Sequence, residues 1–175
     1  MSDSKAVSAD FDAFDVWKLV SGRRQFEGQA PLASLKRLAD LLTDTEGNVT
    51  YRVEFGTDEL QVPSVQISVQ AALPLVCQRS LQRFEHDVSI EQTLGLITDE
   101  ADEAALPPGY EPILVPKDGK IRPMDLVEDE LIMAVPLVPV APGTEAMEQE
   151  WGASDDEVAA ASPFAALSKL KGSTS

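Results

Sequence analysis

The sequence predicts an α+β fold, an antiparallel, meander-like sheet of short strands that is packed by a few helices and followed by a disordered C-terminal tail. Apolar and polar residues alternate along three successive stretches between residues 49 and 90, which is the period of half-buried strands. Residues 31–42 and 125–135 instead carry apolar residues at helical spacing. Beyond residue 140 the chain is rich in Ala, Pro, Gly and acidic residues without any period.

These patterns divide the chain into four parts. With 175 residues, of which 43% are hydrophobic, the chain can build one core of ordinary size. We expect a disordered N-terminus over residues 1–9 and a single α+β domain over 10–140. An acidic disordered linker over 141–161 should lead to a short helical docking segment or tail over 162–175.

The N-terminal part of the domain predicts two helices. Residues 10–21 space their apolar side chains at helical intervals, and Gly22 stands where such a helix would end. Pro31 suits the first turn of a second helix, 31–42, because a first-turn N–H has no partner within the helix. The leucines of this second helix share one face, which we expect to pack against the sheet.

The middle of the chain predicts the sheet. Alternation runs over residues 49–55, 65–75 and 81–90, and a short further strand is expected at 94–97. Three such strands in succession favour an antiparallel meander with one buried face. Pro74 cannot donate a ladder hydrogen bond, so it predicts an edge position or a bulge.

The last predicted helix has the clearest start, face and stop. Asp125 and Glu128 have the spacing of a capping box, and Pro136 ends the helix. Its apolar side is expected to pack on the sheet. Its acidic side, which includes Asp129 and Glu130, is expected to face solvent.

Charge and cysteine content exclude several classes of protein. The net charge is −16, so the overall field repels nucleic acid, and phosphate contact needs a local positive patch. The single cysteine, Cys77, allows neither an internal disulfide nor a multi-cysteine zinc site. The N-terminus has no apolar run, and no window approaches 18 uninterrupted apolar residues. We therefore expect a cytoplasmic protein without a signal peptide or a membrane span.

The sequence carries no set of residues typical of an enzyme. Cys77 and the single histidine, His86, are nine residues apart, and an extended chain between them keeps them out of hydrogen-bond reach. We expect Cys77 to be a core thiol and His86 to be half-buried. The acidic run of the last helix predicts a solvated face rather than a metal site. We therefore expect no catalytic residue, metal, cofactor or small-molecule substrate.

Basic residues in the first half of the chain predict a positive patch on this acidic protein. Scattered solvated charges are the alternative, since surface charges usually have no specific role. The candidates for contact with RNA phosphates are Arg23, Arg24, Lys36, Arg37, Arg52, Arg79 and Arg83.

The tail and the acidic helix face predict a second kind of surface, for a protein partner. Residues 162–172 begin with a Ser-Pro pair that suits a helix start, and they end in lysines. So short a segment folds only on contact, either with a partner or with its own domain. The docking candidates are Phe164, Leu167, Lys169, Leu170 and Lys171 in the tail, and Glu128, Asp129 and Glu130 in the helix.

Three blocks carry a family resemblance: FEGQAPLASLKRLADLL (26–42), LPLVCQRSLQRFEHDV (73–88) and MDLVEDELIMAVPLVP (124–139). Together they resemble the YceD family, the large ribosomal RNA subunit accumulation proteins, and the terminal SPFAALSKLKG is similar to the ending of proteobacterial members. Some members carry cysteines after the third block that suit zinc. This chain has none there, so no metal is implied. The resemblance implies a role in the synthesis, processing or stability of large-subunit (23S) ribosomal RNA, without known catalytic activity.

Two functions are consistent with these observations. The first is a non-enzymatic ribosome-biogenesis factor that contacts precursor ribosomal RNA or a pre-ribosomal particle through the basic candidates. The alternative is an acidic adaptor that binds a basic ribosomal protein or a nuclease. The two differ in the partner that the protein touches, RNA or protein.

Overall fold

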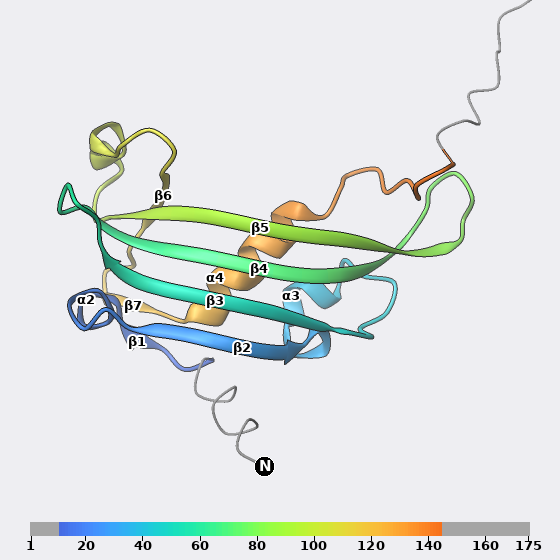
Figure 1. Cartoon of the computed structure of the whole chain (residues 1–175), viewed down its shortest axis with the longest axis horizontal. Coiled ribbons are helices and arrows are strands. Elements are labelled where there is room, and N and C mark those ends of the chain that lie inside the picture. The colour runs from blue at the N-terminus through green and yellow to red at the C-terminus, as the bar shows by residue number, and fades with distance from the viewer. Residues whose placement is uncertain (1–10, 145–175) are drawn as a thin grey trace, which may run out of the picture. The chain divides into compact units, whose positions relative to one another are not determined.

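The structure, a computed structural model, describes residues 11–144 (Figure 1). The chain divides into two units, residues 1–144 and 145–175, and the second unit lies outside the described residues. Residues 141–144 of the predicted disordered linker form a hydrogen-bonded turn, and the rest of the linker and the tail lie outside the described residues. The elements in order are β1 (Phe14–Asp15), α2 (Val16–Ser21), β2 (Gln25–Pro31), η1 (Leu32–Ser34), α3 (Lys36–Ala39), β3 (Asn48–Thr57), β4 (Pro63–Val76), β5 (Arg83–Ile97), η2 (Glu100–Ala105), β6 (Glu111–Leu114), β7 (Lys120–Ile121) and α4 (Pro123–Ala134).

The predicted α+β fold with an antiparallel meander is confirmed. Five strands form a sheet in the order β2-β3-β4-β5-β6, and β1 pairs with β7 separately. The strands β2 to β5 are antiparallel neighbours, whereas β6 runs parallel to β5. The strands are longer than predicted, with 14 residues in β4 and 15 in β5. The separate strand expected at 94–97 is the end of β5.

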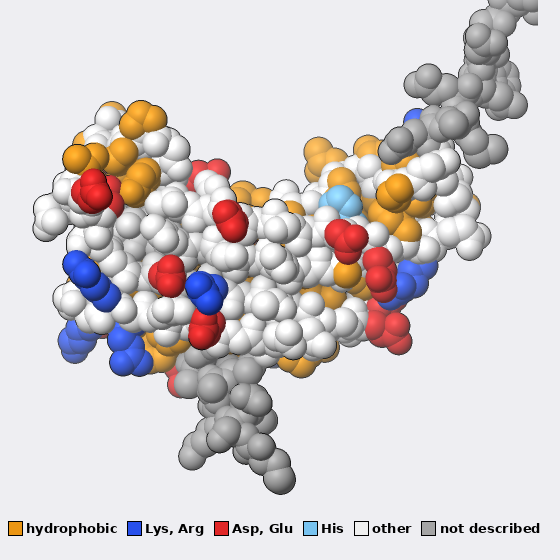
Figure 2. Space-filling view, in the orientation of Figure 1, with side chains coloured by type: hydrophobic (Ala, Val, Ile, Leu, Met, Phe, Trp, Pro, Cys, Tyr) orange, Lys and Arg blue, Asp and Glu red, His pale blue; other side chains and the backbone are white. Residues whose placement is uncertain are grey.

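One face of the sheet carries the core, and α3 and α4 lie on that face (Figure 1). Val53 and Val69 of the sheet are fully buried, as are Val127 and Leu131 of α4. The apolar side of α4 therefore packs as predicted. The opposite face of the sheet is polar and open, and Figure 2 shows acidic and basic side chains scattered among uncharged ones on it.

The predicted helix over 31–42 is wrong. Pro31 belongs to β2, Leu32–Ser34 forms one 3-10 turn, and α3 spans four residues. Leu35 separates the two turns with φ −92° and ψ 87°, outside the helical region. The leucine spacing misled the prediction, because leucines three residues apart bury one face in 3-10 and α turns alike.

The helix α4 ends before Pro136, as predicted, but it starts differently. It begins at Pro123 with Arg122 as N-cap, and no side chain caps it. The expected capping box of Asp125 and Glu128 is therefore absent. Proline suits this start because its backbone has no N–H to satisfy.

Pro74 lies on a local edge inside a central strand. The last β3–β4 pair is Val49 with Ala71, so β4 has no β3 partner at Pro74. The Pro74 carbonyl instead accepts a hydrogen bond from the Thr43 N–H at 2.9 Å. No ladder hydrogen bond is therefore lost at Pro74, although proline has no N–H. This confirms the edge position that the sequence predicted.

Candidate functional site

The pairing of β1 with β7 brings together two segments that are far apart in the sequence. Asp15 pairs with Lys120, and the Val16 N–H donates to the Gly119 carbonyl at 2.9 Å. The helix α2 therefore lies against the turn that precedes β7. Five exposed basic side chains surround this junction, which we call the basic corner: Lys18, Arg23, Arg24, Lys117 and Lys120.

The end of α2 exposes two arginines in succession. The Arg24 N–H bonds to the Leu19 carbonyl at 3.0 Å, and the Arg23 N–H bonds to the Val20 carbonyl at 3.1 Å. This is a Schellman motif, in which Gly22 is the C-cap and Arg23 takes the left-handed conformation with φ 45°. Glycine is usual at the Arg23 position because other residues are strained there.

An exposed aromatic ring stands among these bases. Trp17 is 40% exposed and lies beside Gly119, where an added Cβ would be 3.9 Å from the indole. A neighbouring pocket of about 270 Å³ is lined by Phe14, Asp15, Lys18, Leu19, Arg24 and Phe26. Cationic groups around an exposed ring are suited to binding a phosphate backbone and stacking a base.

The bases of the corner are unpaired. Within residues 11–144, none of the five lies within 4.0 Å of a carboxylate oxygen. Three other RNA-contact candidates are held by acids. These pairs are Arg37–Glu128 (3.0 Å), Arg52–Glu27 (3.1 Å) and Arg83–Asp44 (2.6 Å).

The seven RNA-contact candidates do not all lie on one surface. Arg23 and Arg24 are in the basic corner. Lys36 is exposed on α3, at the other end of the sheet from α2 (Figure 1). Arg79 donates to the Thr144 carbonyl at 3.2 Å, beside the β4–β5 connection. The paired Arg37, Arg52 and Arg83 lie on α3, β3 and β5 respectively.

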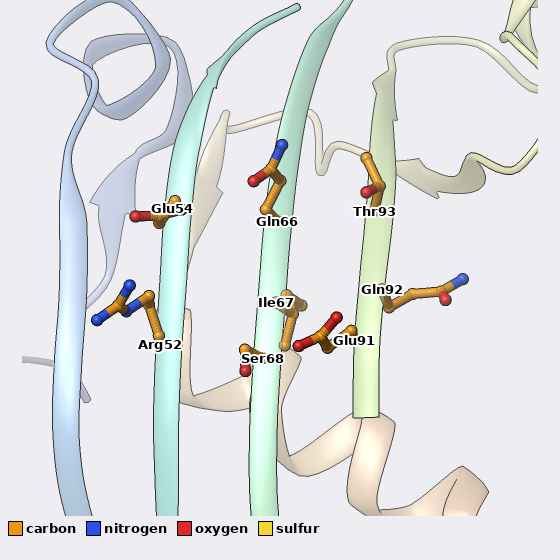
Figure 3. Close-up of a pocket in the computed structure, with 8 residues that line it drawn as sticks. All are labelled: Arg52, Glu54, Gln66, Ile67, Ser68, Glu91, Gln92 and Thr93. Atoms are coloured by element: carbon orange, nitrogen blue, oxygen red, sulfur yellow. The ribbon is translucent and has the colours of Figure 1, made fainter. Parts of the chain in front are cut away.

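The open face of the sheet has a shallow hollow of about 530 Å³ across β3, β4 and β5. Arg52 points from it toward β2, while Glu91 points toward Ser68 (Figure 3). Its other polar groups are mostly amides and hydroxyls, and the eight lining residues include no Cys, His or Lys that could act as a nucleophile or a base for Ser68. We therefore assign no chemistry to this hollow.

Glu128 is buried and structural, contrary to the predicted solvated acidic face. Only 6% exposed, it accepts hydrogen bonds from the N–H groups of Arg37 (2.7 Å) and Leu38 (3.1 Å). These N–H groups belong to the first turn of α3, which has no side-chain cap of its own. Glu128 thus caps α3 from another helix. Asp129 is exposed and pairs with Arg37 Nη1 at 2.6 Å.

Glu130 is also buried, at 7% exposure, but it is not satisfied in the same way. No donor to its carboxylate is seen within residues 11–144, and no enclosed side-chain oxygen there lacks a partner, so the carboxylate oxygens reach solvent. Burial, and then the charges of Glu111 and Asp129, raise the pKa of Glu130. A buried carboxylate beside two like charges is suited to receive a cation.

Cys77 is buried where the segment that follows α4 meets the β4–β5 connection. A backbone hydrogen bond from Ala141, followed by hydrogen bonds from Ser80, lowers the pKa of Cys77 to about 6. His86 pairs with Leu73, four residues from Cys77, which is about 13 Å along a strand. The two side chains therefore form no nucleophile–base pair.

Within the described range, no group of three or more His, Cys, Asp or Glu residues could hold a metal ion. No helix of residues 11–144 is long and apolar enough to cross a membrane. The tail docking candidates, Phe164, Leu167, Lys169, Leu170 and Lys171, lie outside the described residues.

Three residues of this surface were not predicted from the sequence: Lys117, Lys120 and Trp17. Nothing local shows that the two lysines approach α2, because the β1–β7 pairing involves only two residues of each strand. The one available signal was an Asp-Gly turn with a lysine on each side.

Comparisons with known proteins agree with the resemblance seen in the sequence. A family model described as "Large ribosomal RNA subunit accumulation protein YceD" matches residues 65–171. A curated protein of Haemophilus influenzae, named large ribosomal RNA subunit accumulation protein YceD, is 32% identical over 156 residues. That alignment covers 85% of this chain and 88% of the relative. No solved structure matches the chain.

Proposed function

The chain belongs to the YceD family, and we propose that it is a non-enzymatic ribosome-biogenesis factor that supports the accumulation of large-subunit (23S) ribosomal RNA in the cytoplasm. We further propose that it contacts precursor RNA, free or in a pre-ribosomal particle, through the basic corner. The family name supports the first statement, and the unpaired bases of the corner support the second. No catalytic step is part of this proposal.

One observation carries the proposed contact: an acidic protein, with net charge −16, keeps at one junction five bases that pair with no carboxylate of residues 11–144. A base already paired with a carboxylate must give up that pair before it can neutralise a phosphate. The corner bases have no such competitor within residues 11–144. Trp17 adds a stacking surface between α2 and the turn at Gly119.

Salt dependence of RNA binding tests this contact. The test variant replaces Lys18, Arg23, Arg24, Lys117 and Lys120 by Gln, which lowers the net charge by five. We expect weaker binding to a precursor ribosomal RNA fragment and a log–log salt slope smaller by up to about 4, at roughly 0.7–0.9 per phosphate contact.

A matched control separates the corner from the overall field. It lowers the net charge equally by placing Glu at five exposed positions of the open sheet face: Gln29, Thr50, Gln66, Gln70 and Ser89. This control should keep the wild-type slope. Equal slopes for the test variant and the wild type, with both variants folded, would rule out the corner as the contact.

A second candidate function is an acidic adaptor for a basic ribosomal protein or a nuclease. The observation that favours it is the acidity around the β5 edge and Glu130. Of the docking residues first considered in α4, Glu128 is occupied by α3, so Glu130 is the better candidate. Crosslinking that recovers protein and no RNA would favour this function over the first.

A further inference from the structure

Most of β5 has a partner strand on one side only. All of it up to Gly95 pairs with β4, whereas β6 covers only the four residues from Leu94 to Ile97. Within residues 11–144, no strand pairs with residues 83–93 on the side away from β4. An edge of this length offers a row of free backbone groups to another chain.

The hydrogen bonds at the two ends of β5 show which of its residues face this open edge. The Ile97 carbonyl accepts from the Val115 N–H at 2.8 Å, so odd-numbered residues point toward β6. The Gln82 carbonyl accepts from the Cys77 N–H at 2.9 Å, so even-numbered residues point toward β4. The residues that present N–H and C=O groups to the edge are therefore Arg83, Glu85, Asp87, Ser89, Glu91 and Thr93.

This edge is protected by charge alone: three acids, and Arg83, which pairs with Glu85 at 3.5 Å. Residues 83–93 contain no Pro, Lys or Gly, and their pairing with β4 runs without a bulge. The helix α4 ends over β5 (Figure 1), and two apolar residues at and beyond this end are exposed. Met133 is 65% exposed and Leu137 is 97% exposed.

The charges along the edge select the kind of chain that can add to it. Glu85, Asp87 and Glu91 are exposed on the open face of the sheet, at alternating positions. A second copy pairing antiparallel would bring acids near acids, which is unfavourable, and an RNA phosphate would be repelled. The half-buried Phe84 and Ile90 lie on the other face and suit apolar side chains.

The far end of the open stretch carries two more acids. Glu111 pairs with Leu94, so it stands where an added strand would meet the start of β6. Glu130 of α4 is 7% exposed, and after burial the charge of Glu111 is the next cause that raises its pKa. A cationic side chain from an added strand would relieve the repulsion between these two carboxylates.

We propose that residues 83–93 of β5 bind an extended basic segment of a protein partner as an added strand, with Lys or Arg at alternate positions and apolar residues between them. Backbone hydrogen bonds provide affinity in this mode, and the alternating side chains provide specificity. The proposal is independent of the RNA contact, which involves the opposite edge of the sheet.

The test uses the full chain and a synthetic peptide of alternating Lys or Arg and Val, followed by NMR. We expect the peptide to slow hydrogen exchange of the amides of Glu85, Asp87, Ser89 and Glu91. Ser89→Pro removes one edge N–H without touching the β4 ladder, so it should abolish binding. Ser89→Ala is the matched control and should bind like the wild type.

A second variant, which changes the edge charges and introduces no proline, tests the same binding independently. Glu85→Gln, Asp87→Asn and Glu91→Gln together should weaken peptide binding about ten-fold at low salt, because three cross-strand charge pairs are lost. RNA binding by Ser89→Pro should remain at the wild-type level, which separates this test from that of the basic corner.

Several results would overturn the proposal. One is a wild-type protein that does not bind the peptide, or a folded Ser89→Pro variant that binds it unchanged. Another is a wild-type dimer that Ser89→Pro dissociates, which would assign the edge to a second copy. Protection of the same amides by an RNA fragment would assign the edge to nucleic acid.

Discussion

The two edges of the five-stranded sheet lie beside surfaces of opposite charge. At the β2 end, the basic corner gathers five unpaired bases around α2 and β7. At the other end, the open part of β5 has three exposed acids, with Glu111 and Glu130 beside its end. Charge is thus sorted in space, although the sequence shows only an acidic chain with interspersed bases. A net charge of −16 therefore does not exclude RNA binding at one end.

The helix α4 spans the distance between these surfaces. It starts next to β7 and ends over β5 (Figure 1). Glu128, midway along the helix, ties it to α3. The two charged surfaces are therefore connected by one helix. Loss of the contact between Glu128 and α3 should lower the free energy of unfolding without changing the charge of either surface.

Glu128→Ala should have the largest effect, a loss of about 2–3 kcal/mol in the free energy of unfolding. It leaves two N–H groups of α3 and the Nε of Arg37 without their acceptor, while Arg37 keeps its pair with Asp129. Denaturant unfolding measures the loss. Asp129→Ala is the control, since it removes only an exposed ion pair and should cost less than about 1 kcal/mol. Equal losses for the two variants would contradict the capping role of Glu128.

Arg23→Gly should move stability and RNA binding in opposite directions. Glycine relieves the left-handed strain at φ 45° and should add about 1 kcal/mol to the free energy of unfolding. The same change removes one corner base and should lower the salt slope of RNA binding by roughly 0.7–0.9. Thermal melts and binding titrations measure the two effects. A more stable variant with an unchanged slope would remove Arg23 from the contact surface.

Glu130→Gln should raise stability at neutral pH, because the pKa of Glu130 is raised by burial and by Glu111 and Asp129. A carboxyl with a raised folded-state pKa costs stability once it ionises. The advantage of Gln should therefore be absent below the unfolded pKa of about 4.3, and it should grow as the pH rises through the folded value. Melting temperatures at pH 4 and pH 7 test this. A lower melting temperature for the variant at pH 7 would show that Glu130 has a stabilising partner.

Cys77→Ala, at the β4–β5 connection, should have an effect that depends on pH and is smallest in acid, where the thiol is protonated. The pKa of Cys77, lowered to about 6 by hydrogen bonds from Ala141 and then Ser80, lies below the unfolded thiol value of about 8.5. The thiolate therefore contributes stability that is complete above pH 8.5 and is lost as the pH falls through 6. Unfolding of wild type and variant from pH 5 to 9 should show their difference growing with pH. A difference independent of pH would mean that the thiol stays protonated.

Strands and one helix were predictable because their patterns are local. The alternation of Val49 to Phe55 fixes β3, and Pro136 fixes the end of α4. The helix over 31–42 was predicted wrongly. Leu35 is buried with a backbone outside the helical region, and the N-terminus of the short helix that follows is capped by Glu128. Periodicity cannot reveal a cap that another helix supplies.

The candidate site was only partly predictable, for a similar reason. Arg23 and Arg24 are neighbours in sequence and were found, whereas Lys117 and Lys120 join them through a two-residue strand pair. The ion pair of Arg37 with Glu128 connects residues that are also far apart in the chain. Whether a base is paired or unpaired is thus a tertiary property, and it separates the corner from the other candidates.

The most direct test of the central claim is ultraviolet crosslinking of the full chain to precursor ribosomal RNA, followed by mass spectrometry of the crosslinked peptides. If RNA binds at the basic corner, adducts should form in two peptides, those that contain Trp17 to Arg24 and Lys117 to Lys120. Adducts confined to the β5 edge, or to the paired Arg52 and Arg83, would contradict it.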